Sequence, residues 1–202
     1  MRDLLVYPKT RKLFLIWVPF AALHFAAAGW LGLPLWAVLL AIITGVLGYS
    51  LIEYCAHRWV YHWEPRNRYL RMLTGDLARK HIGHHHNPSE YGGSINGNQW
   101  PIVAFALFLS ASSIAWPFYP TAFCLVAIGV GGLNYMIQEY VHFGTHQMPM
   151  TNRILAIQKR HHMLHHYRDD ESNFGLFWPF WDYVFRTDFN SVQRRKARAA
   201  AG

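Results

Sequence analysis

The sequence is poor in cysteine and in carboxylates, and both shortages argue against common kinds of site. Its two cysteines, Cys55 and Cys124, lie in apolar stretches, which argues against a disulfide framework and favours small apolar filler. A structural zinc site often uses cysteine and needs only four ligands. A ferritin-like di-iron site needs carboxylates from four helices and two Glu-x-x-His motifs. This chain has 11 carboxylates and a single match, Glu139 with His142.

Several catalytic motifs are also missing. The sequence has neither the metalloprotease motif His-Glu-x-x-His nor the hydrolase motif Gly-x-Ser-x-Gly. It has no Gly-x-Gly-x-x-Gly, and no haem-binding or flavin-binding segment is apparent in so short a chain. We therefore do not expect a metalloprotease, a serine hydrolase or a fused flavin or haem domain.

Histidine is abundant instead, and its spacing predicts a metal site. The 13 histidines outnumber the carboxylates, and neutral imidazole is a good ligand for first-row transition metals. Histidines at i, i+3 and i+4 share one helix face, so the rings of a triple can converge on one point. One ion takes roughly four to six ligands, so ten imidazoles imply two ions. The ten candidate ligands form four groups: His57 and His62; His81, His84 and His85; His142 and His146; and His162, His165 and His166.

The first of these pairs has an unusual spacing. His57 and His62 are five residues apart, which on a regular helix separates them by about 140°. Either the two rings serve different sides of a site or the helix is distorted between them.

Long apolar runs predict an all-α integral membrane protein. The 202 residues are 52% apolar, and the runs have about the length needed to cross a hydrocarbon core. Breaks at Gly32-Leu33-Pro34 and Pro117-Phe118-Tyr119-Pro120 divide them into two hairpins. We expect no cleavable signal peptide, because no small-residue cleavage site is convincing. The predicted transmembrane helices span about 13–31, 35–55, 101–117 and 121–141.

The polar remainder is predicted to form a helical cap on this membrane domain. It comprises residues 56–100, which include a Gly- and Asn-rich loop at 91–98, and residues 142–190. A basic tail follows at 191–202, so we expect one domain over 1–202.

Charge predicts the orientation of the chain. All 19 Lys and Arg lie in 1–12, 58–80 or 153–198, and the two breaks contain none. By the positive-inside rule, both termini and the middle segment are cytoplasmic, which places the four histidine groups on one side. The net charge of +8 then indicates anionic lipid rather than nucleic acid as partner. We expect His24, alone within the first run, to be a satisfied intramembrane histidine.

Three histidine segments resemble the histidine boxes of the membrane fatty acid hydroxylase superfamily. They are Glu53-Tyr54-Cys55-Ala56-His57-Arg58-Trp59-Val60-Tyr61-His62, His81-Ile82-Gly83-His84-His85 and His161-His162-Met163-Leu164-His165-His166. Asn173-Phe174-Gly175 and Trp181-Asp182-Tyr183-Val184-Phe185-Arg186-Thr187 are similar to the family's closing segment. The resemblance covers roughly residues 45–188 and is strongest to the fatty acid and ceramide 2-hydroxylase branch.

The resemblance implies a cytosolic cap in which histidines hold two iron ions, with zinc as a substitute in purified protein. It implies oxygen-dependent hydroxylation of a lipid C–H bond, in this branch 2-hydroxylation of a fatty acyl or sphingolipid-like chain. A desaturase or a sterol or carotenoid hydroxylase with the same centre stays open. So does a membrane metal-binding or transport protein without redox chemistry.

The sequence departs from the branch at one ligand. The box that ends the fourth helix is His-x-x-x-His in the branch, and Gln138 stands where its first histidine would be. Either His146 or Gln138 completes the site. The carboxylates Glu53, Glu139, Asp169, Asp170 and Asp182 are candidates for accepting ligand N–H bonds. We expect His86 and His161 to support the site or face solvent, and the aromatic residues of 174–181 to lie at the membrane interface.

The implied reaction needs two electrons from outside the chain. We expect a separate donor, a ferredoxin or a cytochrome b5-like protein with its reductase. A bacterial inner membrane is the favoured location, with the endoplasmic reticulum as the alternative.

Overall fold

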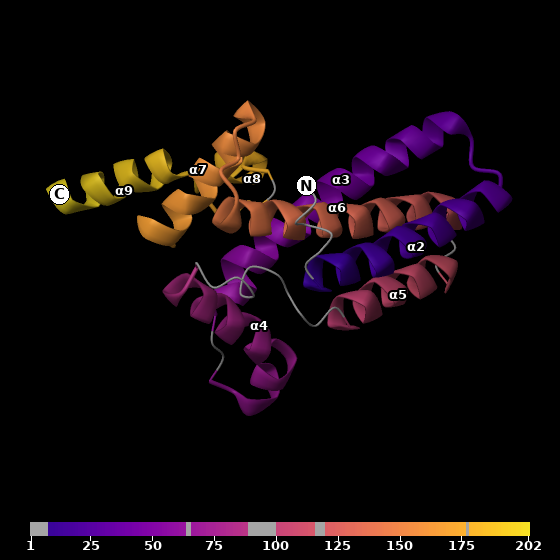
Figure 1. The fold of residues 1–202 in the computed structure, drawn as a ribbon, viewed down its shortest axis with the longest axis horizontal. Helices are drawn as coiled ribbons and strands as arrows, with labels where there is room; N and C mark the ends of the chain where they lie inside the picture. The colour runs from indigo at the N-terminus through magenta and orange to yellow at the C-terminus, as the bar shows by residue number, and fades with distance from the viewer. Residues whose placement is uncertain (1–7, 64–65, 89–99, 116–119, 177) are drawn as a thin grey trace. The chain divides into compact units, whose positions relative to one another are not determined.

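The structure is a computed structural model that describes residues 8–63, 66–88, 100–115, 120–176 and 178–202. Within these residues it contains helices and no strand (Figure 1). The helices are α2 (Pro8–Trp30), α3 (Leu35–Ala56), the π-helix η1 (His57–Tyr61), α4 (Arg68–His86), α5 (Trp100–Ala115), α6 (Thr121–Gln147), α7 (Arg153–Tyr167), α8 (Phe180–Val184) and α9 (Phe189–Ala201).

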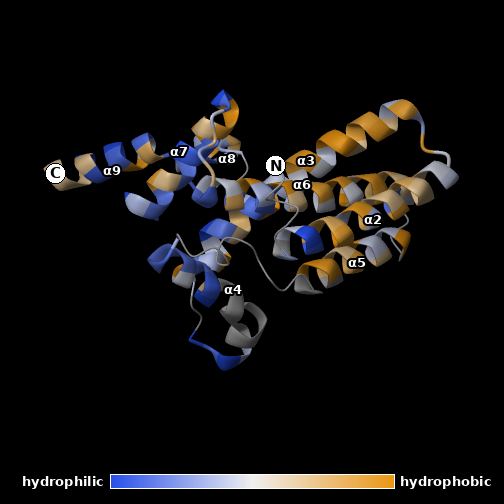
Figure 2. Cartoon of the chain, in the orientation of Figure 1, coloured by the Kyte–Doolittle hydropathy of each residue, from blue (hydrophilic) through white to orange (hydrophobic). Residues whose placement is uncertain are grey.

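The chain divides into two compact units. The apolar unit comprises the described parts of Met1–Tyr49 and Ile95–Tyr140, and the histidine unit those of Ser50–Ser94 and Val141–Gly202. Hydropathy follows this division, because α2 and α5 and most of α3 are apolar whereas α4, α7 and α9 are largely polar (Figure 2).

Three helices of the described residues are long and apolar enough to cross a membrane. They cover Thr10–Trp30, Leu35–Tyr61 and Thr121–Gln147. Many of their large apolar side chains point outward, as lipid-facing side chains do; Leu35 is 74% exposed and Trp36 70%. The protein is therefore a membrane protein. The predicted fourth span, 101–117, corresponds to the shorter α5, whose apolar stretch is Phe105–Ile114, and its last two residues lie outside the described part of the chain.

Small residues let the helices of the apolar unit approach closely. A Cβ atom on Gly45 of α3 would lie 2.5 Å from the carbonyl oxygen of Ala127 in α6. A Cβ atom on Gly132 of α6 would lie 2.7 Å from the ring of Trp17 in α2. Small residues at helix interfaces are a common means of packing in membranes, where burial of apolar surface drives no association.

The expectation for His24 is confirmed. Its Nδ1 lies 2.8 Å from the Phe20 carbonyl oxygen and its Nε2 2.8 Å from Ser110 Oγ, so both ring nitrogens are hydrogen-bonded and α2 is joined to α5. The predicted break after α2 is also confirmed, because Gly32 has φ +71° and α3 begins directly after Pro34. The predicted loop at 91–98 and residues 117–119 of the second break lie outside the described residues.

The histidine unit contains η1, α4, α7, α8, α9 and the C-terminal ends of α3 and α6. Asn152 caps α7, since its side-chain oxygen accepts hydrogen bonds from the backbone N–H groups of Ile154 and Leu155. Asp188 caps α9 in the same way through Ser191. The predicted basic tail is thus a helix, fixed by the buried Val192 and by ion pairs from Lys196 to Asp169 and Glu171.

Candidate metal centre

The structure gathers the ten predicted ligands into two adjacent groups of five. The first histidine group comprises His57, His62, His81, His85 and His165, and the second comprises His84, His142, His146, His162 and His166. Within each group, one ring nitrogen from every residue lies within 4.8 Å of the others. The groups adjoin one another, because the rings of His85 and His166 stack with centroids 4.1 Å apart.

Each histidine triple divides between the two groups instead of converging on one point. Within α4, His81 and His85 join the first group while His84 joins the second. Residues at i and i+4 lie about 40° apart around a helix axis, whereas the i+3 residue is about 100° from the i+4 residue. Within α7 the same geometry sends His162 and His166 to the second group and His165 to the first. The three rings of a triple therefore do not meet at one point, although their spacing would allow it.

A π-helix resolves the unusual spacing of His57 and His62. In η1 the hydrogen bonds run from i to i+5, so residues five apart come close to one another on the helix surface. The two rings stack with centroids 5.2 Å apart. Of the two alternatives that the spacing left open, the distorted helix is the one observed.

In the first group, ring nitrogens lie within hydrogen-bonding distance of one another, but the neutral rings have too few protons for all of these contacts. His57 Nε2 and His85 Nε2 each lie 3.0 Å from His81 Nε2. His165 Nε2 lies 3.1 Å from His85 Nε2. His57 Nδ1 lies 2.5 Å from the Phe174 carbonyl oxygen and His165 Nδ1 2.7 Å from the Ser172 carbonyl oxygen. A carbonyl only accepts, so in the neutral rings these Nδ1 atoms carry the protons and both Nε2 atoms present lone pairs.

A cation satisfies this arrangement. The three contacts between ring nitrogens need three protons, but only His81 and His85 have an Nε2 proton to give. His62 Nε2 adds a further buried nitrogen that has no partner among the described residues. A metal ion accepts all of these lone pairs at once, so the residues present fit a metal.

The second group has the same character. His84 Nε2 lies 3.2 Å from His142 Nε2 and 3.0 Å from His146 Nε2, which in turn lies 2.9 Å from His162 Nε2. Both ring nitrogens of His166 are buried and have no partner among the described residues.

Burial keeps these imidazoles neutral. Burial lowers the pKa of His84 to about 4, and burial together with the neighbouring His62, His84 and His86 lowers the pKa of His85 to about 3. The pKa of His166 is likewise lowered by burial and by the histidines around it. A neutral ring is the form that binds metal, so the site is competent at neutral pH.

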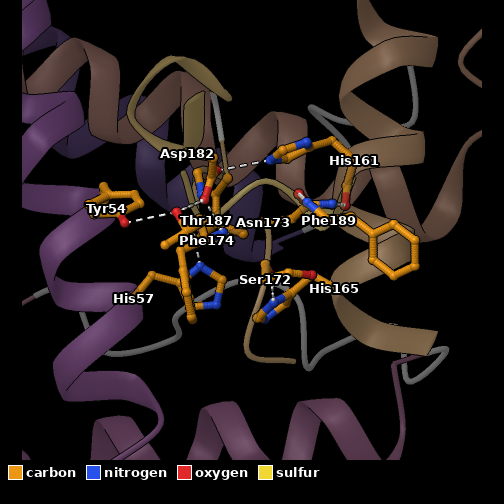
Figure 3. A network of polar contacts seen from close by, with 12 residues as sticks. Tyr54, His57, His161, His165, Ser172, Asn173, Phe174, Asp182, Thr187 and Phe189 are labelled. Atoms are coloured by element: carbon orange, nitrogen blue, oxygen red, sulfur yellow. Dashed lines mark hydrogen bonds and ion pairs between the residues drawn. The ribbon is translucent and has the colours of Figure 1, made fainter. Parts of the chain in front are cut away.

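Asp182 organises the loop that accepts the histidine protons (Figure 3). The carboxylate is fully buried. Its Oδ1 accepts hydrogen bonds from Phe174 N at 2.9 Å and Thr187 Oγ1 at 2.8 Å, and its Oδ2 from Gly175 N at 2.8 Å. His161 Nε2 lies 2.9 Å from the same Oδ2, so His161 supports the loop and lies in neither histidine group.

The sequence predicts carboxylate acceptors, whereas the acceptors of the Nδ1 protons of His57 and His165 are backbone carbonyls. The Asp182 carboxylate binds the loop and not one of the ten histidines. Glu53 Oε1 accepts a hydrogen bond from Leu176 N at 2.9 Å, and Asp169 binds Lys196. A main-chain carbonyl leaves no trace in a sequence. Asn173, which adopts φ +58° beside Phe174 and Gly175, is a sequence feature that can mark this loop.

The aromatic residues near this loop have different placements. Phe174 is buried and packs edge-on against His57, with ring centroids 5.8 Å apart. Trp178 and Phe180 are exposed, as an interfacial position requires, and Trp181 donates a hydrogen bond to Ser50 Oγ. Phe177 lies outside the described residues.

The structure places Gln138 and His146 differently. His146 belongs to the second group, whereas Gln138 is buried in the apolar unit, where its side-chain oxygen accepts a hydrogen bond from the Tyr49 hydroxyl. Glu139 is buried in the same unit. His86 is exposed at the end of α4.

A polar pocket of about 580 Å³ opens beside both groups within the histidine unit. His85 of the first group and His166 of the second line it. Its other walls are charged and polar and come from the end of α4, the end of α7 and the exposed side of α9, including Arg168, Asp170 and Lys196. The pocket thus opens one histidine of each group toward solvent.

Comparison with known proteins decides the family. The sequence model named Fatty acid hydroxylase matches residues 42–187, which include all ten histidines. The chain belongs to the fatty acid hydroxylase family. A ceramide very long chain fatty acid hydroxylase, scs7, of Schizosaccharomyces pombe is 30% identical over 182 residues, which cover 86% of this chain and 49% of the relative. A fatty acid 2-hydroxylase of Rattus norvegicus is 29% identical, covering 72% of this chain and 38% of the relative.

For another similar protein, the match covers a larger share of the relative's own length. A dihydroceramide fatty acyl 2-hydroxylase, FAH1, of Arabidopsis thaliana is 26% identical, over 85% of this chain and 70% of the relative. The chain thus spans half or less of the yeast and rat relatives. A solved structure of scs7p, in which only the hydroxylase domain is visible, superposes with a TM-score of 0.74 over 89% of this chain and 66% of the other, at 24% identity. This likeness shows that the fold is shared.

Proposed function

We propose that the protein hydroxylates a lipid C–H bond with dioxygen at two iron ions, one held by each histidine group. The observation that carries the proposal is the pair of five-histidine groups, each with its ring nitrogens within 4.8 Å of one another. A non-redox structural ion would need about four ligands, so ten buried imidazoles around adjacent positions favour a two-metal centre.

The reaction consumes two electrons and two protons. R–H, O2, two electrons and two protons give R–OH and water; the C–H bond breaks, one oxygen atom enters the lipid and the other leaves as water. Bound iron supplies the activation of dioxygen. The chain holds the ten neutral imidazoles in place, and the ring of Phe174 shields the first group from water by packing against His57, His62 and His165.

The polar pocket suits the delivery of protons to the centre and the release of product water. It brings water and titratable side chains to His85 and His166, so protons have a route to the centre and product water has a way out. Its charged walls do not suit an acyl chain. We therefore propose that the lipid approaches from another side of the histidine unit.

The proposed substrate is a fatty acyl or sphingolipid-like chain that is hydroxylated at carbon 2. The names of the similar proteins support this class, since they include a ceramide hydroxylase, a fatty acid 2-hydroxylase and a dihydroceramide fatty acyl 2-hydroxylase. The apolar helices would keep the enzyme in the membrane in which such lipids reside.

We propose a separate electron donor, a ferredoxin or a cytochrome b5-like protein with its reductase. We also propose that the termini and the histidine unit face the cytoplasm, in a bacterial inner membrane or in the endoplasmic reticulum. The positive-inside distribution of Lys and Arg supports this orientation.

Lipid mass spectrometry tests the proposed reaction. Cells that express the chain with a donor system under 18O2 should accumulate acyl chains that gain one labelled oxygen at carbon 2, and cells that express His165→Ala should not. Loss of two hydrogens instead would indicate a desaturase. Protein that binds two metal ions yet changes no lipid when iron, reductant and oxygen are supplied would indicate a metal-binding protein and contradict the proposal.

A further inference from the structure

The two histidine groups differ in the hydrogen bonds of their Nδ1 atoms. In the first group, backbone carbonyls of Phe174 and Ser172 accept the Nδ1 protons of His57 and His165. In the second group, the Nδ1 atoms of His84, His162 and His166 are buried and have no hydrogen-bond partner among the described residues.

Burial does not account for the difference. Both groups contain buried histidines, His57 and His165 in the first and His84, His142 and His162 in the second, and the polar pocket reaches one histidine of each. The distinction is in the hydrogen bonds alone. An acceptor on the outer nitrogen fixes the tautomer and the ring orientation and makes the ligating nitrogen more basic.

The loop that provides the two carbonyls is itself held rigidly. Asp182 accepts hydrogen bonds from the backbone N–H groups of Phe174 and Gly175, and the side chain of Asn173 donates to the His161 carbonyl oxygen at 3.0 Å (Figure 3). A Cβ atom on Gly175 would lie 3.0 Å from Asp182 Oδ2, so the loop and the carboxylate are in close contact. Asp182 holds the peptide of the Phe174 carbonyl directly through Gly175 N. It holds the peptide of the Ser172 carbonyl through Thr187, whose carbonyl oxygen accepts from Asn173 N and whose hydroxyl donates to Asp182.

We propose that the two metal positions are inequivalent, and that Asp182 is the positioning residue that makes the first histidine group the tighter and slower to exchange. The loop held by Asp182 presents two acceptors to the first group, whereas the Nδ1 atoms of His84, His162 and His166 in the second group have no acceptor among the residues that the structure describes. The first position fills first and loses its metal last. This inference rests on the metal binding in the proposed function.

Metal exchange on the full chain in detergent tests the inference. Protein loaded with two equivalents of 65Zn²⁺ is mixed with excess unlabelled Zn²⁺ and a chelator, and the bound label is followed in time. We expect two phases of one equivalent each that differ at least tenfold in rate. His84→Ala should retain only the slow phase and His165→Ala only the fast one, which assigns each phase to its group.

Asp182→Asn should accelerate the slow phase about 10- to 100-fold, the usual effect of losing outer hydrogen-bond support on metal binding, and leave the fast phase unchanged. The matched control is Asp188→Asn, which removes a carboxylate at the N-cap of α9, where the Asp188 side chain accepts a hydrogen bond from Ser191 N and where Asn caps equally well; both phases should stay as in the wild type. Thr187→Val removes a single bond to Asp182 and should give a smaller acceleration of the slow phase if Asp182→Asn does not fold.

A loss of general stability would accelerate both phases together, so the selective effect separates positioning from a merely structural role. One common rate for both equivalents, or equal acceleration of both phases in Asp182→Asn, would overturn the inference and leave the two-metal proposal standing. Failure to bind two equivalents at all would overturn the proposed function, and the inference with it.

Discussion

Individual imidazoles decide which metal position a substitution empties. His165 belongs to the first group and His84 to the second, and each is buried with its ligating nitrogen beside those of its neighbours. We expect His165→Ala and His84→Ala each to bind about one metal ion per chain instead of two, and each to lose hydroxylation, because the reaction needs both positions. Inductively coupled plasma mass spectrometry gives the count.

His86→Ala is the matched control for these two substitutions. His86 follows His85 on α4 but is exposed and lies in neither group, so its removal should leave the metal count unchanged. Full turnover in either ligand variant would contradict the assignment of ligands.

Buried neutral histidines also predict how metal-free protein responds to acid. The folded chain holds the pKa of His84 at about 4 and of His85 at about 3, whereas the histidine of an unfolded chain has a pKa near 6.5. As the pH falls below about 6.5, the unfolded chain takes up protons that the folded chain refuses, so folding stability is lost toward pH 4. Metal-free protein should melt at a lower temperature at pH 5 than at pH 7.5. A melting temperature that rises on acidification would contradict the burial of neutral rings.

At the level of residues, the sequence predicted which side chains gather but not what holds them. The metal-binding chemistry of histidine and its helical spacing indicated the ten candidates. The acceptors for His57 and His165 are carbonyls of Phe174 and Ser172, and every residue has a carbonyl, so no sequence pattern marks the two in use.

Among the elements, η1 makes the clearest prediction. Its π-helical turn brings together two histidines five residues apart. Deleting Val60 would place His57 and the following histidine four apart, on one face of an ordinary α-helix, and we expect such protein to keep two metal ions. Inserting one alanine after Val60 would place them six apart, about 120° from each other around an α-helix, and the first position should be lost, leaving about one ion. Equal metal content in the two variants would contradict the role of the π-helix.

The helices themselves followed from hydropathy where apolar runs end in clear breaks. The run predicted over 35–55 is α3, Leu35–Ala56, and the break at Gly32 lies where expected. The run over 121–141 continues as helix to Gln147, because His142 and His146 face the second group rather than ending the helix. The change from apolar to polar residues after 141 therefore ends the apolar run, but α6 continues beyond it.

For the whole molecule, the distribution of charge predicts an orientation that labelling can test. In a background with Cys55 and Cys124 replaced by Ser, Leu35→Cys lies directly after the first break and Arg198→Cys lies on α9; both sites are exposed. A membrane-impermeant maleimide should label Leu35→Cys in intact bacterial spheroplasts, and Arg198→Cys only after permeabilisation. Labelling in the opposite order would contradict the cytoplasmic placement of the histidine unit.

The sequence also predicted that histidines from distant parts of the chain meet, but not how they divide. Two ions followed from the number of imidazoles, whereas the distribution of each triple between two groups depends on where α4 and α7 lie within the histidine unit. For α7, that placement is supported by His161, whose ring contacts Asp182 and whose carbonyl oxygen accepts a hydrogen bond from Asn173, and no local sequence pattern contains these long-range contacts.

The most direct test of the two-metal centre is an anomalous difference map at the iron absorption edge from crystals of iron-loaded protein. The geometry predicts two peaks of similar height, one among His57, His62, His81, His85 and His165 and the other among His84, His142, His146, His162 and His166. A single peak shared by both groups, or iron bound outside them, would contradict the account.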